Sequence, residues 1–277
     1  MSPRVLLLTG LFITLASCSY GEDQKVLLKQ FAAEFVDILP GTAGFPKTFR
    51  RGSAAAPAEG PMAEVTISQP FAIGKYEVQQ NLYESVMGKN PSRWKGPRNS
   101  VEMMTWGEAK EFCDRVTRLM REAALIGATD VIRLPTEAEW EYCCRAGTET
   151  AYSFGEEATA EGDQGNRATR LDPYAWHTGN AAGNDPPVGA LKPNPWGLYD
   201  MHGYLWEFCG DGWAGSYEGA PVDGSPRPVE GAKTAIVIRS GSWKDRHPDL
   251  RSSSRREFPQ TGRDDAVGFR CVRSQAP

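Results

Sequence analysis

Regular periodicity almost disappears from this sequence after Gly147, and this absence restricts the possible folds more than any other feature. Only two later runs, 236–239 and 267–272, predict strands. The chain holds 29 Gly, 20 Pro and eight Trp. Gly and Pro interrupt helices and strands, whereas large aromatic side chains anchor irregular backbone. The sequence therefore predicts a loop-rich fold.

The first half of the chain carries the regular elements. Strands are predicted at 35–39 and at 65–76 (the latter a strand or hairpin around Pro70), helices at 79–87, at 105–126 and from Thr136, and a loop at 52–62. Thr105 and Glu108 have the spacing of a capping box at the start of the longest helix. No internal repeat or domain-sized linker interrupts the pattern, so we expect one domain at 34–274.

Composition is that of an ordinary globular protein, with 40% hydrophobic and 24% charged residues. The formal net charge is −4, and the isoelectric point is about 5.6. A nucleic-acid-binding domain usually carries a basic footprint, which this composition lacks. We therefore expect no nucleic-acid partner.

The N-terminus has the pattern of an export signal. Arg4 precedes a short apolar stretch at 6–15, which has the length of a signal peptide and is too short to span a bilayer. The stretch ends in Leu-Ala-Ser-Cys at 15–18, which resembles a bacterial lipobox. We expect a signal peptide at 1–17, lipidation of Cys18 and a tether at 18–33. The alternative is a plain signal peptide cut after Cys18 or Gly21.

These expectations place the protein at the bacterial cell envelope, held to the membrane by a lipid anchor only. Five further cysteines, an odd number, would then lie in an oxidising compartment, where they are disulfide candidates. The chain has three His, and no cysteine pair has the close spacing and flanking ligands of a zinc site.

Five segments, in order, carry the similarity to a known family. They are 76–78 (YEV) with 86–92 (VMGKNPS), 105–106 (TW) leading to 112–113 (FC), 133–142 (RLPTEAEWEY), 194–207 (NPWGLYDMHGYLWE), and 241–243 (GSW) with 268–271 (GFRC). Together they resemble the formylglycine-generating enzyme, or sulfatase-modifying factor, family. The resemblance implies an α+β fold, a variant of the C-type lectin-like fold with two central helices, small antiparallel sheets and much ordered loop.

The resemblance also locates that family's copper site. Family members bind one copper(I) ion through two cysteines, three and eight residues after the Ser that matches Ser242, and oxidise a substrate cysteine to formylglycine. Here those positions hold Asp245 and Leu250. Soft thiolates suit copper(I), whereas a carboxylate is a hard ligand and leucine is none. We therefore expect neither copper nor formylglycine-generating activity.

A calcium site is implied by the loop that matches 200–207. Family members use side-chain oxygens at its first and eighth positions, here Asp200 and Glu207, and backbone carbonyls at its fourth and sixth, here Gly203 and Leu205. Such hard oxygen ligands suit structural calcium. The alternative is that both carboxylates only hold the turn together through hydrogen bonds.

Only some of the family's disulfide positions are matched by cysteines in this sequence. Cys113 and Cys271 match a disulfide that joins the long helix to the last strand. Cys144 matches a half-cystine whose partner position is Arg255, so it is left to pair with Cys209, with Cys143 free; the sequence leaves this pairing open.

The segment 243–265 is crowded with charges in the region that lines the family's substrate cleft. Its candidates for binding anionic groups, with the neighbouring Ser242, are His247, Arg251 and Arg255. The alternative is a solvated charged surface. Glu137, Trp140, Glu141 and Trp206 are expected to cap helices and fill the core, His202 to be structural, and His177 to be the better functional candidate of those two histidines.

The favoured hypothesis is an exported family member without formylglycine-generating activity that binds a ligand or protein partner at the cell envelope. One alternative is an oxidoreductase acting on an exported substrate, by formylglycine generation or siderophore-type maturation. Another is a hypervariable ligand-display lipoprotein, since such proteins share this fold.

Overall fold

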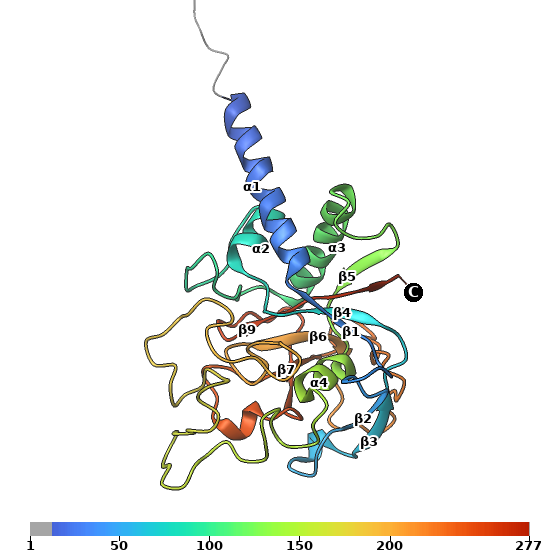
Figure 1. Ribbon diagram of the computed structural model, residues 1–277, viewed down its shortest axis with the longest axis vertical. Coiled ribbons are helices and arrows are strands. Elements are labelled where there is room, and N and C mark those ends of the chain that lie inside the picture. Colours follow the sequence, from blue (N-terminus) through green and yellow to red (C-terminus); the bar gives the residue numbers. More distant parts are fainter. Residues whose placement is uncertain (1–12, 277) are drawn as a thin grey trace, which may run out of the picture.

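A four-stranded antiparallel sheet joins the start of the domain to its end (Figure 1). The computed structural model describes residues 13–276, and their side chains from residue 21 onward. The strand order is β1 (Phe35–Ile38), β4 (Phe71–Gly74), β10 (Val272–Gln275) and β5 (Asp130–Arg133). The predicted strand at 35–39 is therefore confirmed.

A second four-stranded sheet lies below the first in Figure 1. Its order is β8 (Arg255–Phe258), β7 (Ile236–Arg239), β6 (Trp206–Gly212) and β9 (Val267–Gly268), with β6 and β9 parallel and the other pairs antiparallel. The run predicted as one strand at 267–272 is divided between the two sheets. The division falls at Phe269, Arg270 and Cys271, which are buried where the chain crosses from one sheet to the other.

The hairpin expected at 65–76 is also divided. β3 (Ala63–Thr66) pairs with β2 (Thr48–Arg51) in a separate two-stranded sheet, and β4 begins after Pro70 in the first sheet. A proline has no N–H to give to a strand pair, so it separates the two strands rather than joining them.

Three helices confirm the helical predictions. They are α2 (Gln80–Met87), α3 (Trp106–Glu122) and α4 (Glu137–Arg145). The side chains of Thr105 and Thr136 each accept a hydrogen bond from the backbone N–H three residues further on. The carboxylates of Glu108 and Glu139 in turn accept the backbone N–H of these two threonines. Both α3 and α4 therefore begin in a full capping box. Helix α3 ends at Glu122 and is therefore shorter than the helix predicted at 105–126.

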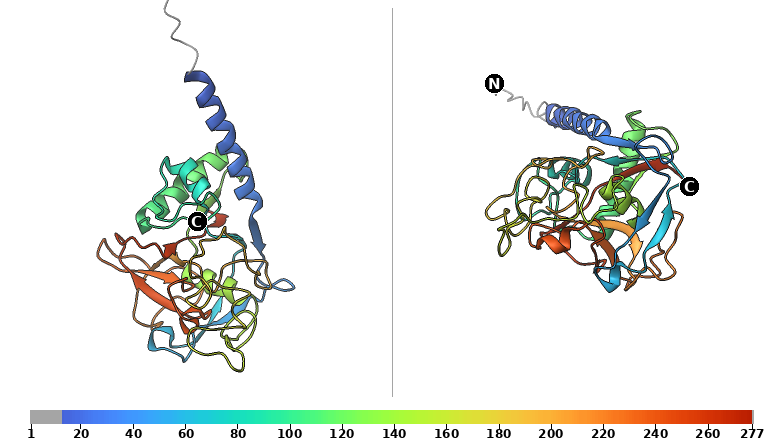
Figure 2. Two further views of the ribbon diagram at one scale, coloured as in Figure 1. Left: turned by 90° about the vertical axis from the view of Figure 1, so that its left-hand side faces the viewer. Right: turned by 60° about the horizontal axis from the view of Figure 1, so that its bottom comes forward.

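Helix α1 (Ile13–Ala33) corrects the expected tether at 18–33. The helix extends away from the sheets, and its C-terminal part runs along α2 (Figures 1 and 2). Leu28 and Phe31 are buried in the core of the domain. The domain therefore begins before residue 34, because this part of α1 packs against α2 and its apolar pair is buried.

The predicted export signal lies largely outside the described residues. Residues 1–12 are not among the described residues, and Cys18 lies in α1 with an undescribed side chain. Within residues 13–276, no helix combines the length and apolar character needed to cross a membrane.

Loops fill most of the chain between α4 and β6, as the lost periodicity predicts. Polar side chains in this region form hydrogen bonds with backbone groups that have no strand or helix partner. Asn194 accepts the N–H groups of Trp196 and Leu198 and donates to the carbonyl of Cys143. A small apolar cluster of Tyr152, Ala168, Leu171 and neighbours gives this region its own core.

Candidate functional site

Asp245, at the first copper position of the family, is held by three donors. The indole N–H of Trp206 donates to it at 2.7 Å, the hydroxyl of Ser242 at 2.5 Å and the guanidinium of Arg256 at 3.2 Å. Its side chain is largely buried. The carboxylate therefore joins the loop that follows β7 to β6 and β8.

Leu250, at the second copper position, is fully buried. It ends a short 3-10 helix (His247–Leu250) and packs in the apolar cluster of Tyr152, Ala168 and Leu171. A hard carboxylate and a buried alkyl group thus stand where two thiolates would be needed. The residues present do not fit a copper(I) centre.

Three tryptophans with cations against their rings lie near Asp245 and Asp265: Trp206 donates to Asp245, and Trp94 and Trp243 donate to Asp265. Arg93 lies over the ring of Trp94 at 5.0 Å, Lys244 over Trp243 at 5.2 Å and Arg256 over Trp206 at 4.5 Å. We call these six residues the tryptophan surface. Trp94 is 45% exposed and the three cations are exposed as well, whereas Trp243 is half-buried and Trp206 is buried beneath Arg256.

Acidic groups fix the orientation of the tryptophan surface. The indole N–H of Trp94 donates to the carboxylate of Asp265, and that of Trp243 donates to the carbonyl of the same residue, both at 3.3 Å. Arg93 and Lys244 form ion pairs with Asp265. Because each ring and each cation has a fixed partner, the surface is ordered before any ligand arrives.

Glu102 lies beneath Trp94. One of its carboxylate oxygens accepts the backbone N–H of Trp94 at 3.0 Å, and the other is buried without a hydrogen-bond partner among the described residues. Burial raises the pKa of Glu102 to about 7. Its protonated form lowers the cost of the unpaired oxygen.

Two cleft candidates, Arg251 and Arg255, are structural in this fold. Arg251 makes a two-bond ion pair with the buried Glu59, at 2.7 Å for each bond. Arg255 is buried, pairs with Glu137 and stacks on Trp213 and Tyr217. Neither guanidinium is available to an anionic ligand, because tertiary packing has already given each a carboxylate.

The Arg255–Glu137 pair belongs to a buried ionic cluster on α4 and β7. Arg239 joins Glu137 and Glu141 at 2.8 Å each, and Tyr217 donates to both carboxylates. Although burial acts to raise it, the Arg255 and Arg239 guanidiniums lower the pKa of Glu137 to about 2. The structural role expected for these glutamates agrees with this geometry.

The loop with the expected calcium ligands also contains an arginine. Glu207 is fully buried, and its carboxylate accepts two bonds from Arg270 at 2.7 Å and one from the indole N–H of Trp140 at 2.9 Å. Asp200 accepts the backbone N–H of Gly189 at 2.7 Å. Among the described residues, no group of three or more His, Cys, Asp or Glu side chains is arranged to hold a metal ion.

The chemistry of this oxygen set nevertheless fits calcium. Glu77 is a third buried carboxylate here, and burial, Glu207 and Asp200 raise its pKa well above the usual range. Burial also raises the pKa of Asp200 to about 6. Three carboxylates thus face the one cation of Arg270, and one oxygen of Glu207 accepts only a single bond, which leaves a lone pair for a cation. Asp200, Glu207 and the carbonyls of Gly203 and Leu205 are the residues that would hold the ion.

Cys113 and Cys271 lie side by side. Their sulfur atoms are 3.9 Å apart, both side chains are buried, and the structure has them as thiols. The expected disulfide stays a prediction. Cys143, Cys144 and Cys209 are buried in a second apolar cluster, and Cys144 contacts His202 rather than another sulfur.

The three histidines are held by local contacts. Both ring nitrogens of His177 are hydrogen-bonded, one to Asp172 at 2.8 Å and the other to the N–H of Gly179 at 3.0 Å. This geometry does not favour His177 over His202 as a functional residue. His202 is buried and contacts Ser153 and the carbonyl of Leu250. Burial lowers the pKa of His202 to about 4, which fits a structural residue. His247 is half-buried and begins the 3-10 helix.

Sequence reasoning missed Arg93, Trp94 and Glu102 as parts of the site. They lie far before Asp265 in the chain, and the fold alone brings Arg93 and Trp94 into contact with that residue. The one available signal was the large, polar-flanked tryptophan at 94 inside the loop that ends α2.

Comparisons with known proteins agree with this architecture. A family model, the sulfatase-modifying factor enzyme 1-like domain, matches residues 27–275. Chaperone protein LppX of Paenibacillus barcinonensis is 28% identical over 256 residues, 76% of this chain and 82% of that protein. The formylglycine-generating enzyme of Thermomonospora curvata is 36% identical over 121 residues, 40% of this chain and 38% of that enzyme.

Two solved structures share the fold. PvdO from Pseudomonas aeruginosa superposes with a TM-score of 0.72 at 28% identity, over 87% of this chain and 94% of that chain. Variable protein 1 of Treponema denticola gives a TM-score of 0.71 at 26% identity, over 88% and 95%. The expected α+β variant of the C-type lectin-like fold is confirmed. This chain belongs to the sulfatase-modifying factor enzyme 1-like family.

Proposed function

We propose that this chain is an exported family member without formylglycine-generating activity, and that its tryptophan surface binds a protein partner at the cell envelope. The observation that carries the proposal is the pairing of Asp245 with Trp206, Ser242 and Arg256 at the first copper position. The group that would ligate copper in a relative is here a structural support for the surface around it.

The composition of this surface supports a protein partner. Tryptophan and arginine are the residues most enriched among those that dominate binding energy at protein interfaces. Here Arg93, Trp94, Trp243 and Arg256 meet in one ordered region whose cations and rings are already positioned. The relative LppX is named a chaperone, a class of protein that acts on other proteins.

The absence of copper chemistry is tested directly. The purified protein is supplied with copper(I), O₂ and a peptide carrying the sulfatase cysteine motif, and the peptide mass is followed. We expect no conversion of cysteine to formylglycine, because Asp245 and Leu250 provide no thiolate. An authentic formylglycine-generating enzyme serves as the positive control. Conversion by this protein above the enzyme-free rate would overturn the proposal.

Partner binding is tested by photo-crosslinking in the native host. A photoreactive benzoylphenylalanine replaces Lys244, which is exposed on the tryptophan surface, or Glu64, which is exposed on β3. We expect one discrete adduct from position 244 that Trp94→Ala weakens, and none from position 64. No adduct, or the same adduct from both positions, would count against binding at this surface.

A second candidate is a variable ligand-display protein, favoured by the similarity to variable protein 1 of Treponema denticola. Display requires that exposed positions of 243–265 differ among copies of the gene while Asp245 and Asp265 stay constant. Sequencing the gene from many isolates distinguishes the two candidates, since a protein with one fixed partner would keep the whole surface.

A further inference from the structure

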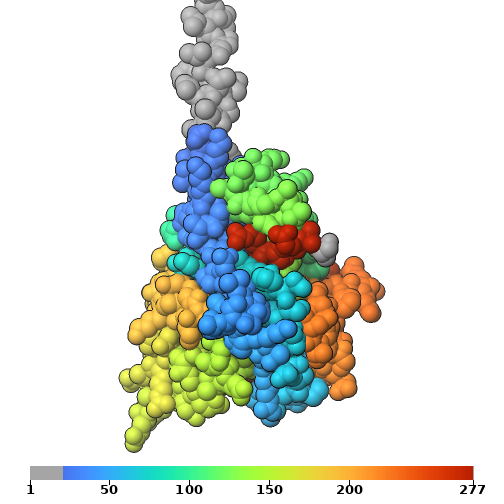
Figure 3. Space-filling view, turned by 45° about the vertical axis from the view of Figure 1, so that its right-hand side comes forward, coloured from blue at the N-terminus to red at the C-terminus, as the bar shows by residue number. Residues whose placement is uncertain are grey.

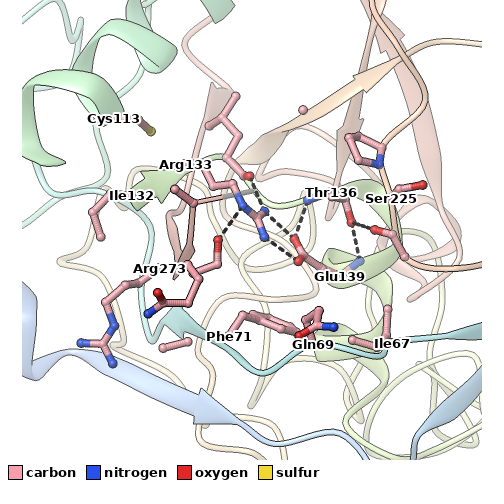
Figure 4. A pocket seen from close by; sticks show the side chains of 18 of the residues that line it. Ile67, Gln69, Phe71, Cys113, Ile132, Arg133, Thr136, Glu139, Ser225 and Arg273 are labelled. Carbon is pink, nitrogen blue, oxygen red and sulfur yellow. Dashed lines mark hydrogen bonds and ion pairs between the residues drawn. The ribbon is translucent and has the colours of Figure 1, made fainter. Parts of the chain in front are cut away.

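A hollow lies at the edge of the first sheet, and it is separate from the tryptophan surface. Its volume is about 1240 Å³, and it is lined by parts of β4, β5, β10 and α3 and by the loop at 223–229. Figure 4 shows Arg133 and Glu139 pointing toward one another inside it, with Ile67, Gln69 and Phe71 on one side. No residue of the tryptophan surface lines it.

The hollow exists because β4 and β10 separate. Val272 pairs with Ile73 and Arg273 pairs with Ala72, and the register between these two strands ends there. β10 continues beside β5 on its other edge, where Ser274 and Gln275 pair with Val131 and Asp130. One edge of the last two residues of β10 therefore has no neighbouring strand.

The backbone of Gln275 faces this unpaired edge. The N–H of Ala276 donates to Thr129, which lies beside β5, and the carbonyl of Cys271 accepts from Gly74 beside β4. Successive residues of a strand direct their N–H and C=O groups to opposite sides. The N–H and C=O of Gln275 therefore point toward the space that β4 has left. Figure 3 shows the C-terminal strand (red) at the surface, between green α3 and the cyan of β4.

The walls combine apolar surface with a negative balance of charge. Phe71, Leu134 and Trp106 contribute apolar groups. Five acidic and three basic side chains line the hollow. Arg133 and Glu139 neutralise one another through two bonds of 2.7 Å, and Arg273 pairs with Asp37. Asp114, exposed on α3, forms no ion pair among the described residues, and Lys110, one turn before it, lies over the ring of Trp106 at 4.3 Å.

We propose that this hollow binds an extended peptide segment of a partner protein, which adds to β10 through the backbone of Gln275 and places a basic side chain near Asp114. A free strand edge supplies main-chain affinity, and pockets for alternate side chains supply specificity. The volume exceeds the usual range for small-molecule sites, which is about 300–1,000 Å³. This site goes beyond the proposed function, because it shares no residue with the tryptophan surface.

The experiment uses two ten-residue probe peptides, one of alternating valine and lysine and one of alternating valine and glutamate, with the purified protein and fluorescence anisotropy. We expect the lysine peptide to bind at least about tenfold more tightly than the glutamate peptide. Asp114→Lys should weaken the affinity for the lysine peptide by about tenfold. The matched control Glu122→Lys, exposed on the same helix but outside the hollow, should leave the affinity unchanged.

The backbone contact is tested by Gln275→Pro, which removes the N–H at an unpaired edge where proline is tolerated. Gln275→Ala loses the side-chain hydrogen bonds to Thr129 and Asp130 but keeps the N–H. Relative to that variant, we expect Gln275→Pro to bind about three- to tenfold more weakly at a similar Tm. Three results would each overturn the proposal. They are equal binding of both peptides, no binding of the lysine peptide up to about 1 mM, and unchanged affinity for the lysine peptide in Gln275→Pro. The photo-crosslinking result at position 244 is independent of each of these outcomes.

Discussion

Arg255 and Glu137 are joined by two hydrogen bonds of 2.6 Å and 2.9 Å inside the domain, between the edge strand β8 and the first turn of α4. Both residues are buried. The pair connects the second sheet to the helix, and it uses a residue that the sequence offered as a ligand-binding arginine.

Arg255→Ala is expected to destabilise the protein by about 3–5 kcal/mol, because it leaves the buried charge of Glu137 with one partner fewer. The matched control Glu257→Ala, exposed on the same strand, should change the free energy of unfolding by no more than about 0.5 kcal/mol. Urea unfolding measures both. Similar values for the two variants would show that Arg255 has no structural role.

The Asp211 carboxyl should make stability depend on pH. Burial, together with the charge of Glu137, raises its pKa from 3.8 to about 7 in the folded protein. The stability that this group contributes is fully present below pH 3.8 and is lost as the pH rises through 7. We therefore expect the Tm advantage of the wild type over Asp211→Asn to be larger at pH 5 than at pH 8. A difference that does not vary with pH would contradict the shifted pKa.

Calcium stays a proposal that chelation can test. If the ion binds the folded protein only, a hundredfold excess over Kd stabilises it by about 2.7 kcal/mol. A chelator should then lower Tm, and Asp200→Ala should abolish this response. Asp37→Ala, which alters an exposed carboxylate, is the control and should keep it. An unchanged melt with chelator would leave Asp200 and Glu207 a purely turn-stabilising role.

A disulfide between Cys113 and Cys271 is expected in the exported protein, since their sulfur atoms already lie 3.9 Å apart. Closing a loop between residues 158 positions apart contributes about 5 kcal/mol in the entropic model. A reducing agent should lower Tm in the wild type but not in Cys113→Ala. Detection of two free thiols at these positions in protein isolated from the envelope would refute the pairing.

Lipidation of Cys18 is tested by fractionation. The wild-type protein should partition with membranes, and Cys18→Ala should be released or remain as uncut precursor. The neighbouring Ser19→Ala is a control that should behave like the wild type. Recovery of all wild-type protein in a soluble fraction would exclude the anchor.

Local patterns were enough to predict part of this fold. The two capping boxes at Thr105 and Thr136 and the apolar face of α3 depend only on residues a few positions apart, and both helices begin where the sequence indicates. The family followed from long motifs, and its copper positions were read by counting from Ser242. Asp245 and Leu250 carry their chemistry in their identity, so no structure was needed to predict the missing thiolates.

Tertiary structure decided which charged side chains are paired inside the domain and which remain exposed to a ligand. Arg251 and Arg255 looked alike as groove residues, but each meets a buried glutamate from a distant segment, Glu59 and Glu137. Likewise, Trp94 reaches Asp265 across most of the chain, and β4 leaves β10 after Arg273. The sequence by itself determined the family, the helix starts and the lost copper ligands. The partners of buried charges and the open strand edge depend on contacts between distant segments, which only the folded chain brings together.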